Sequence, residues 1–149
     1  MDFISHPIEK GYTLEYHCKS VAHKARELCH GLNLNCETTA YYAGLLHDVG
    51  KLNPWYQDFF HIAKRNRPES KDFISKYAQR HPALSVRAAE KLLDQSVHDL
   101  TSTNILQALC AIAGHHTDLK KVLAGESSQP FANSHKDMEK NLAEWARQV

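Results

Sequence analysis

The sequence predicts an all-α protein, a compact bundle of helices that forms one domain. Apolar residues recur at steps of three and four over several stretches, which is the spacing of an amphipathic helix. No stretch alternates apolar and polar residues over a useful strand length, and no internal repeat or low-complexity tract occurs. At 149 residues the chain is long enough to bury one core without disulfides. We therefore expect residues 1–149 to form a single domain.

The first predicted helix begins after Thr13, a suitable N-cap, and ends at Gly31. Its apolar stripe consists of Leu14, His17, Val21, Ala25 and Leu28. His17 therefore lies on the inward side of the helix. A lone inward histidine is more often a hydrogen-bonded core residue than a metal ligand. Only further metal-binding residues that face the same place would favour the second interpretation.

The second predicted helix starts at about Glu37, runs to His47 and Asp48, and is apolar enough to be buried on nearly all sides. We expect Gly50 to adopt the left-handed conformation that stops this helix. The side chains of His47, Asp48 and Lys51 can then converge on one cavity, where an imidazole and a carboxylate bind one or two cations. The plainer alternative is a polar helix end.

A third helix is predicted after Asn53 and Pro54, an N-cap followed by proline at the first helical position. Its apolar face consists of Trp55, Phe59 and Ile62. The following stretch from Lys64 to Arg80 is basic and polar, with aromatic residues interleaved. A solvated surface is the simpler interpretation of this stretch, and a surface that binds a nucleic-acid strand is the alternative.

Two further helices are predicted to begin or end at histidines. His81 and Pro82 repeat the N-cap and proline signal of a helix start. After a polar break from Asp99 to Thr103, another helix closes on His115 and His116, whose side chains diverge from one spot. The tail from residue 133 carries a last apolar stripe that we expect to dock on the bundle, formed by Met138, Leu142, Trp145 and Val149.

The composition excludes some classes of protein and leaves others open. Lys+Arg 18 against Asp+Glu 17 gives a formal charge of +1, which argues neither for nor against an anionic partner. The four cysteines form no C-x-x-C pair and indicate small apolar residues in a reducing compartment, so we expect a cytoplasmic protein. No signal peptide and no membrane span is predicted. The 11 histidines are the compositional outlier and favour a metal-binding protein.

Metal-binding residue types recur at or near the ends of four predicted helices, and this recurrence is stronger evidence than any single position. They are His17, His47, Asp48, His81, His115 and His116. Five neutral imidazoles and one carboxylate suit two first-row transition ions such as manganese, iron, cobalt or nickel, with magnesium as a further candidate. A closed structural zinc site has four ligands and usually contains cysteine.

This order of residues resembles the HD superfamily of metal-dependent phosphohydrolases, and within it the HD nuclease domain of CRISPR-associated type I effector nuclease-helicases. The resemblance rests on the run from Gly44 to Lys51, the pair Tyr56 and Gln57, His81 opening a helix, and the run from Ala113 to His116. It implies a helical bundle around one or two metal ions. It also implies single-stranded DNA as substrate and a separate or fused helicase and a CRISPR surveillance complex as partners.

The same resemblance assigns roles to individual residues. It makes the six residues above metal ligands and Lys51 a cation that faces the substrate phosphate. A two-metal hydrolysis would activate a water and neutralise phosphoryl charge, and Asp48 is the best bridging ligand because a carboxylate has two oxygens.

One departure from the family pattern concerns a further metal-binding aspartate that usually follows the histidine pair in a later helix. Only Asp118 and Asp137 remain here, and neither position fits. The difference indicates a chain truncated at its C-terminal end, a divergent site or an inactive one. Because fewer carboxylates leave the site with excess positive charge, we expect weaker binding of the ion away from His81, His115 and His116.

Three functions follow as hypotheses. The first is a nuclease that cleaves single-stranded DNA. The second is an HD phosphohydrolase of a nucleotide or signalling nucleotide, although His115 and His116 are not followed by the Gly-Tyr-Pro of the cyclic-dinucleotide branch. The third is a binding subunit that kept the fold and has lost the reaction. No Walker motif is present, so ATP-driven unwinding would need another chain or domain.

Overall fold

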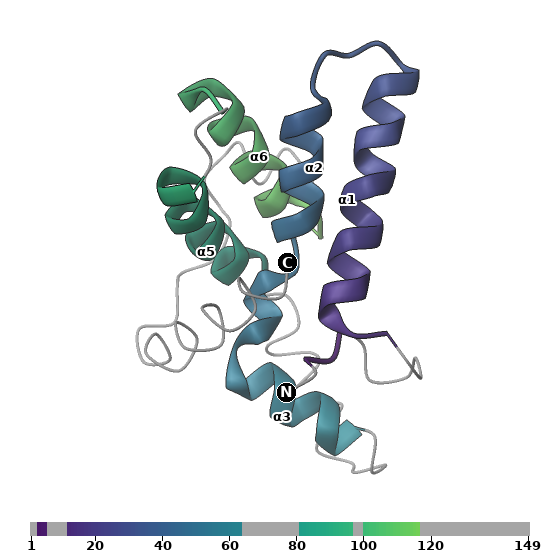
Figure 1. The fold of residues 1–149 in the computed structure, drawn as a ribbon. Helices are drawn as coiled ribbons and strands as arrows, with labels where there is room; N and C mark the ends of the chain where they lie inside the picture. The colour runs from purple at the N-terminus through teal and green to yellow at the C-terminus, as the bar shows by residue number, and fades with distance from the viewer. Residues whose placement is uncertain (1–2, 6–11, 64–80, 97–99, 117–149) are drawn as a thin grey trace.

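The structure, a computed structural model, describes residues 3–5, 12–63, 81–96 and 100–116 (Figure 1). Its helices are α1 Leu14–Gly31, α2 Glu37–Leu46, the 3-10 helix η1 Val49–Leu52, α3 Pro54–Ala63, α5 His81–Ser96 and α6 Ser102–Gly114. These ranges contain no strand beyond an isolated bridge between Ile4 and Thr13, so the predicted all-α class is confirmed. Within the same ranges, no helix has both the length and the apolar character that crossing a bilayer requires.

Helix α1 starts where the sequence predicts, because the Thr13 hydroxyl accepts a hydrogen bond from the Tyr16 amide at 3.1 Å. Its buried face is formed by Leu14, Cys18 and Ala22. The prediction that Leu28 lies on the inward stripe is wrong, because its side chain is 55% exposed. The physical reason is that α1 packs chiefly against α2, so most of its surface has no neighbouring helix in the described part of the chain.

Helices α1 and α2 approach closely where Gly44 faces Ala22. A Cβ atom at Gly44 would lie 2.7 Å from the Ala22 Cα, a distance that no real side chain accepts. Figure 1 shows the two helices antiparallel and side by side. This packing brings the first turns of α1 beside the end of α2, where His17 and His47 lie 3.2 Å apart between their Nε2 atoms.

Gly50 plays a different part from the predicted one. It does not adopt a left-handed conformation, and the chain passes from α2 through His47 in the right-handed helical region into η1. Glycine is required because a Cβ atom at this position would lie 2.2 Å from the His81 carbonyl oxygen and 2.8 Å from the Ser85 amide nitrogen. The first turn of α5 therefore packs directly on the η1 backbone, and the Gly50 amide donates to Ser85 Oγ at 2.9 Å.

The later helices begin close to the predicted positions. Helix α3 starts at Pro54 as expected, and α5 starts at His81 itself. Helix α6 begins at Ser102, inside the polar break that was predicted to extend to Thr103. Thr101 caps the helix there by accepting from the Asn104 amide at 3.2 Å. The side chains of the predicted face Trp55, Phe59 and Ile62 lie outside those that the structure describes, and so do the stretch from Lys64 to Arg80 and the tail from residue 133.

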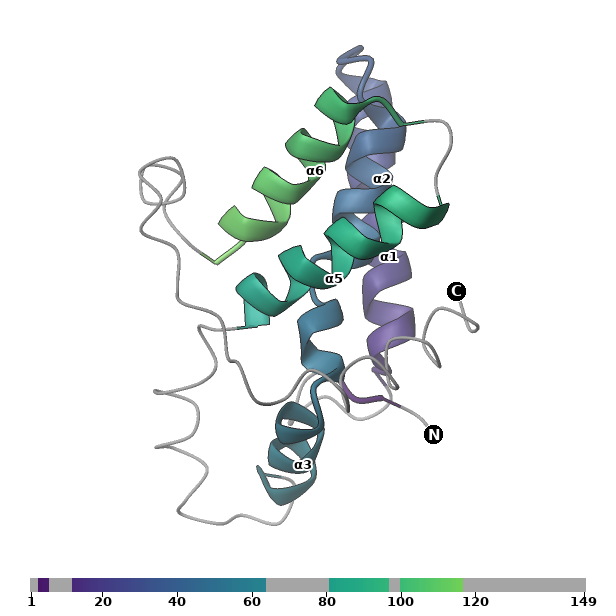
Figure 2. The same ribbon diagram turned by 90° about the vertical axis from the view of Figure 1, so that its left-hand side faces the viewer.

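Helices α5 and α6 lie on the opposite side of α2 from α1 (Figures 1 and 2). The end of α2, the start of α5 and the end of α6 therefore come together around η1. The core beneath this junction includes Leu14, Leu46, Val49, Leu52, Leu84, Leu93 and Ile112. Burial of this apolar surface holds four helix ends in fixed positions, which is the requirement for a site built from separate parts of the sequence.

Candidate metal centre

Asp48 lies at the middle of the junction and is only 2% exposed. It follows α2 in the short turn before η1, so its carboxylate points into the space between α1, α5 and α6. One oxygen, Oδ2, lies 3.2 Å from His17 Nε2 and 3.4 Å from His47 Nε2. The other oxygen, Oδ1, lies 3.0 Å from His81 Nε2 and 3.4 Å from His115 Nε2. The two carboxylate oxygens thus serve two separate groups of histidines.

Backbone carbonyls orient two of these histidine rings. His47 Nδ1 lies 2.7 Å from the Gly44 oxygen, and His115 Nδ1 lies 2.6 Å from the Ile112 oxygen. A carbonyl oxygen only accepts hydrogen bonds, so Nδ1 carries the proton in both rings. The Nε2 atom of each neutral ring then presents its lone pair to Asp48. Metal-binding histidines are held in this way.

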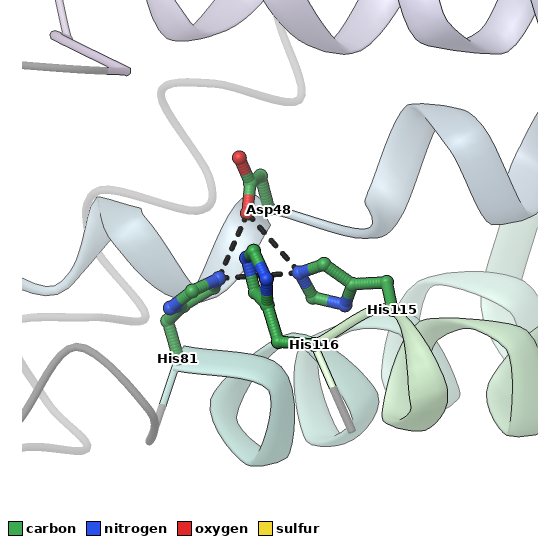
Figure 3. A group of neighbouring side chains, drawn as sticks. All are labelled: Asp48, His81, His115 and His116. Carbon is green, nitrogen blue, oxygen red and sulfur yellow. Dashed lines mark hydrogen bonds and ion pairs between the residues drawn. The ribbon is translucent and has the colours of Figure 1, made fainter. Parts of the chain in front are cut away.

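The ligand atoms form two groups, and Asp48 belongs to both. The first group is Asp48, His81, His115 and His116, which Figure 3 shows with their side chains directed at one another. The second group is His17, His47 and Asp48. Within each group, one potential ligand atom per residue lies within 4.8 Å of those of the others. The structure therefore brings all six predicted ligands together, and three helices besides α2 contribute to them.

The chemistry of this donor set fits divalent metal. Nε2 atoms face each other at 3.2 Å between His17 and His47 and again between His81 and His115. Asp48 Oδ1 is buried and accepts no aligned hydrogen bond, although ring nitrogens surround it. Because Nε2 of His47 and His115 presents a lone pair, the facing ring of His17 or His81 either donates a hydrogen bond to it or binds a cation together with it. Imidazole with carboxylate is a donor set for Mn²⁺, Fe²⁺, Co²⁺ or Ni²⁺.

Burial and charge keep the ligands in the protonation states that metal binding needs. Burial raises the pKa of Asp48, but contacts with His115, His17 and His81 and the charge of Lys51 outweigh it, so the pKa lies far below its usual range. Burial lowers the pKa of His47 to about 4 and also lowers that of His81. The centre therefore presents a carboxylate and neutral imidazoles at neutral pH.

His116 differs from the other histidines because its residue is exposed at the edge of the centre. Its ring centroid lies 4.3 Å from that of His115 and 4.9 Å from that of His81. Partial burial, followed by the nearby imidazoles of His115 and His81, lowers the pKa of His116 to about 4. Of the four residues drawn in Figure 3, this histidine is the exposed ligand candidate.

Lys51 is placed one turn after Asp48 and is 6% exposed. Its Nζ atom donates to Asp48 Oδ2 at 2.6 Å, so the ammonium directly offsets the carboxylate charge. The role that the sequence suggests, contact with a substrate phosphate, stays a prediction. In this structure the partner of the Lys51 ammonium is Asp48.

Sequence reasoning missed two residues that support the centre. Ser85 is fully buried and accepts from the Gly50 amide, which fixes the start of α5. Gln57 donates to the Lys51 carbonyl, a supporting contact that its place in the family resemblance does not indicate. A serine one turn after His81 within an apolar stripe is the signal that could have identified Ser85. The positions Asp118 and Asp137, considered for a further acid, lie outside the described residues.

Comparison with protein families gives one match. The family described as "Cas3, HD domain" matches residues 7–149 of this chain. Neither the curated proteins nor the solved structures yield a match.

Proposed function

Because the chain belongs to the family of Cas3 HD domains, we propose that it is a metal-dependent nuclease that hydrolyses single-stranded DNA with two metal ions. Family membership implies the coarser function, a metal-dependent hydrolase of nucleic acid in a CRISPR system. The finer statement, two ions and a single-stranded substrate, is the proposal. The observation that carries it is Asp48, whose two oxygens serve two groups of histidines.

The division of ligands supports two ions better than one. His17 and His47 approach Oδ2, whereas His81 and His115 approach Oδ1. A single ion would leave the histidines of one group without a metal, although their nitrogens gather around a carboxylate oxygen in the same way. Bound divalent ions would supply an activated water at neutral pH and neutralise the charge of the phosphoryl group. Phosphodiester hydrolysis then needs no nucleophilic side chain.

The residues of the chain hold and orient this centre. The carbonyls of Gly44 and Ile112 fix the tautomers of His47 and His115. Lys51 fixes Asp48 from the buried side through the bond to Oδ2. The half-buried rings of His17, His47 and His115 and the exposed His116 leave the opposite side open to solvent, and we propose that the substrate phosphate approaches there.

The proposed partners follow from the family and not from a surface of this chain. We propose that a helicase, separate or fused, delivers the single strand, and that a CRISPR surveillance complex recruits the assembly. Since no Walker motif occurs in the sequence, cleavage by this chain should not depend on ATP.

A nuclease assay with defined metals tests the proposal. The protein is stripped with chelator, reloaded with Mn²⁺, Co²⁺, Ni²⁺ or Mg²⁺, and given single-stranded DNA, duplex DNA or a nucleotide panel without ATP. We expect cleavage of the single strand with a transition metal. His47→Gln should abolish it, whereas His30→Gln, at a histidine whose side chain is 83% exposed, should not.

The remaining outcomes distinguish the alternatives. Hydrolysis of nucleotides alone would favour a nucleotide phosphohydrolase. Binding of metal and DNA without cleavage would favour a subunit that kept the fold and has lost the reaction. Either result would contradict the proposed nuclease.

A further inference from the structure

Gln57 on α3 makes three hydrogen bonds from a position only 8% exposed. Its Oε1 atom accepts from the Ile4 amide at 2.8 Å. Its Nε2 atom donates to the Ile4 carbonyl at 3.1 Å and to the Lys51 carbonyl at 2.7 Å. The side-chain amide therefore pairs with Ile4 as a neighbouring strand would, and at the same time binds the backbone of η1.

The segment that Gln57 binds also determines where α1 begins. The Leu14 amide donates to the Phe3 carbonyl at 2.7 Å, and the Ser5 amide donates to the Tyr12 carbonyl at 3.4 Å. Ile4 thus uses its own amide and carbonyl for Gln57, while its neighbours pair with the start of α1. Phe3 and Leu14 are both buried, which closes this contact from the core side.

The start of α1 carries His17 within its first turn. Thr13 caps the helix, and the His17 amide donates to the Thr13 carbonyl at 3.1 Å. A displacement of Thr13 would therefore move His17 relative to Asp48 Oδ2, which lies 3.2 Å from its Nε2 atom.

The bond from Gln57 Nε2 to the Lys51 carbonyl links Gln57 to Asp48. Lys51, whose carbonyl accepts from Gln57, donates from its ammonium to Asp48 Oδ2. Gln57 thus connects the segment at Ile4, which pairs with the start of α1, to η1, whose Lys51 binds Asp48. His17 and Asp48, two of the three ligands in the group His17, His47 and Asp48, are therefore both linked to Gln57. His81 and His115 have further contacts that do not involve Gln57, because Ser85 on α5 accepts from the Gly50 amide and the Ile112 carbonyl orients His115.

From this geometry we infer that Gln57 is a positioning residue that holds His17 against Asp48, and so controls the ion bound by His17, His47 and Asp48. The inference rests on the proposed two-ion function. Groups that orient metal ligands without touching the metal typically contribute about 10–100-fold in metal affinity. Asp48 serves both groups, but the segment at Ile4 that Gln57 binds pairs only with the start of α1 and hence with His17, so the loss should fall mainly on one ion.

Two variants test the inference by removing different hydrogen bonds of the Gln57 side chain. Gln57→Glu keeps the acceptor for the Ile4 amide but removes both donated bonds. Ile4→Pro removes the Ile4 amide and leaves the bonds to α1 intact, because those use Phe3 and Ser5. The second variant adds no charge, so it covers the case in which a buried glutamate prevents folding.

The matched control is Asn104→Asp. Asn104 donates from its side-chain amide to Thr39 Oγ1 at 3.0 Å and ties α6 to α2. It stands eleven residues before His115 on one helix, roughly 16 Å away along the axis. The same amide-to-acid change there removes one part-buried donated bond without reaching the centre.

Two measurements are made on each folded protein. Hydrogen exchange of the Ser5 and Leu14 amides is followed in chelator, and Mn²⁺ uptake is followed by calorimetric titration. Since each lost hydrogen bond is worth about 1 kcal/mol, we expect exchange to speed up about fivefold in Ile4→Pro, which loses one, and about thirtyfold in Gln57→Glu, which loses two. We also expect the weaker Mn²⁺ site to lose about 10–100-fold in affinity while the tighter site is unchanged. Asn104→Asp should change neither.

Each contrary result has a distinct meaning. Unchanged exchange in both variants would show that Gln57 does not hold the segment at Ile4 against the start of α1. Faster exchange with two unchanged Mn²⁺ sites would overturn its link to the metal. Equal weakening of both sites would overturn the selective role of Gln57. A wild type that takes up fewer than two ions would contradict the proposed two-ion function instead. The exchange measurement would then still show whether Gln57 holds the segment at Ile4 in place.

Discussion

Asp48 contributes the one carboxylate among the six residues that converge at the centre, and its two oxygens divide the histidines into two groups. At the scale of single residues, the site depends on backbone oxygens that accept hydrogen bonds and cannot donate them. The Gly44 and Ile112 carbonyls can only accept, so the facing Nδ1 atoms must donate and the Nε2 atoms are left for metal. Single substitutions should therefore separate charge from orientation.

Replacing Asp48 by asparagine should abolish binding of both ions, because the shared anionic ligand is lost. It should also destabilise the metal-free protein by about 3 kcal/mol, since the Lys51 ammonium would stay buried without its carboxylate. Elemental analysis and urea unfolding in chelator measure the two effects. Wild-type metal content in the variant would contradict the assignment of Asp48.

Replacing Lys51 by methionine should leave metal bound at least as tightly as in the wild type, because the centre loses a positive charge beside Asp48. Turnover should nevertheless fall by about tenfold or more if the ammonium stabilises charge at the phosphate. Mn²⁺ titration and single-turnover cleavage of DNA check this pair of outcomes. Loss of metal together with activity would show that Lys51 acts only by holding Asp48.

Acid should weaken the metal-free protein through two imidazoles whose pKa values are lower in the folded state than in the unfolded chain. His47 and His116 titrate near pH 4 in the native protein and near 6.5 when unfolded. Between these values the unfolded state binds more protons, so stability must fall as the pH is lowered from about 6.5 to about 4. Asp48, whose pKa is also lowered, adds to the loss at still lower pH. Urea unfolding in chelator at several pH values measures it, and stability that rises toward pH 5 would contradict the expectation.

At the scale of elements, the centre exists because helix ends meet with almost no space between their backbones. Glycine occupies two close backbone contacts, Gly44 between α1 and α2 and Gly50 between η1 and α5. In both places an added Cβ atom would meet backbone, which cannot rotate away as a side chain can. Helix packing and ligand geometry are therefore set by the same two residues.

Gly50→Ala should cost about 1–3 kcal/mol of stability, because α5 must move away from η1 to admit the methyl group. His81 and Ser85 move with α5, so metal affinity should fall as well. Gly31→Ala is the control, since a Cβ atom there meets nothing within 4 Å and should stabilise the helix by about 0.5–1 kcal/mol. Thermal unfolding and Mn²⁺ titration of both variants decide it, and unaltered metal binding in Gly50→Ala would refute the coupling.

At the scale of the whole molecule, metal binding and folding should be coupled, because the six ligands come from segments far apart in the sequence. The unfolded chain cannot gather them, so metal binds the native state alone and stabilises it. At a free concentration of 100 times the dissociation constant, the gain is about 2.7 kcal/mol per ion. Thermal unfolding with and without Mn²⁺ measures it, and an unchanged midpoint would show that the centre takes up no ion.

The sequence by itself determined the helical class, the positions of most helix starts and the identity of the six residues that meet at the centre. Helix periodicity, N-caps and proline are local signals, so they can be recognised without knowing what packs on what. Thr13 and Pro54 illustrate this, since both begin helices where predicted. The order of the histidines and Asp48 carried the family resemblance, and the resemblance added their role as metal ligands, which stays a prediction.

Only the tertiary structure decided how those parts touch. Gly50 was expected to provide a left-handed turn, but it admits the backbone of α5, a contact between residues 35 positions apart. Leu28 belongs to an apolar stripe whose first residue, Leu14, is buried, but Leu28 itself is 55% exposed. The pairing of Lys51 with Asp48 and of Gln57 with Ile4 depends on distances across the fold. Such contacts leave no periodic trace in the sequence, because they arise only when separate elements pack together.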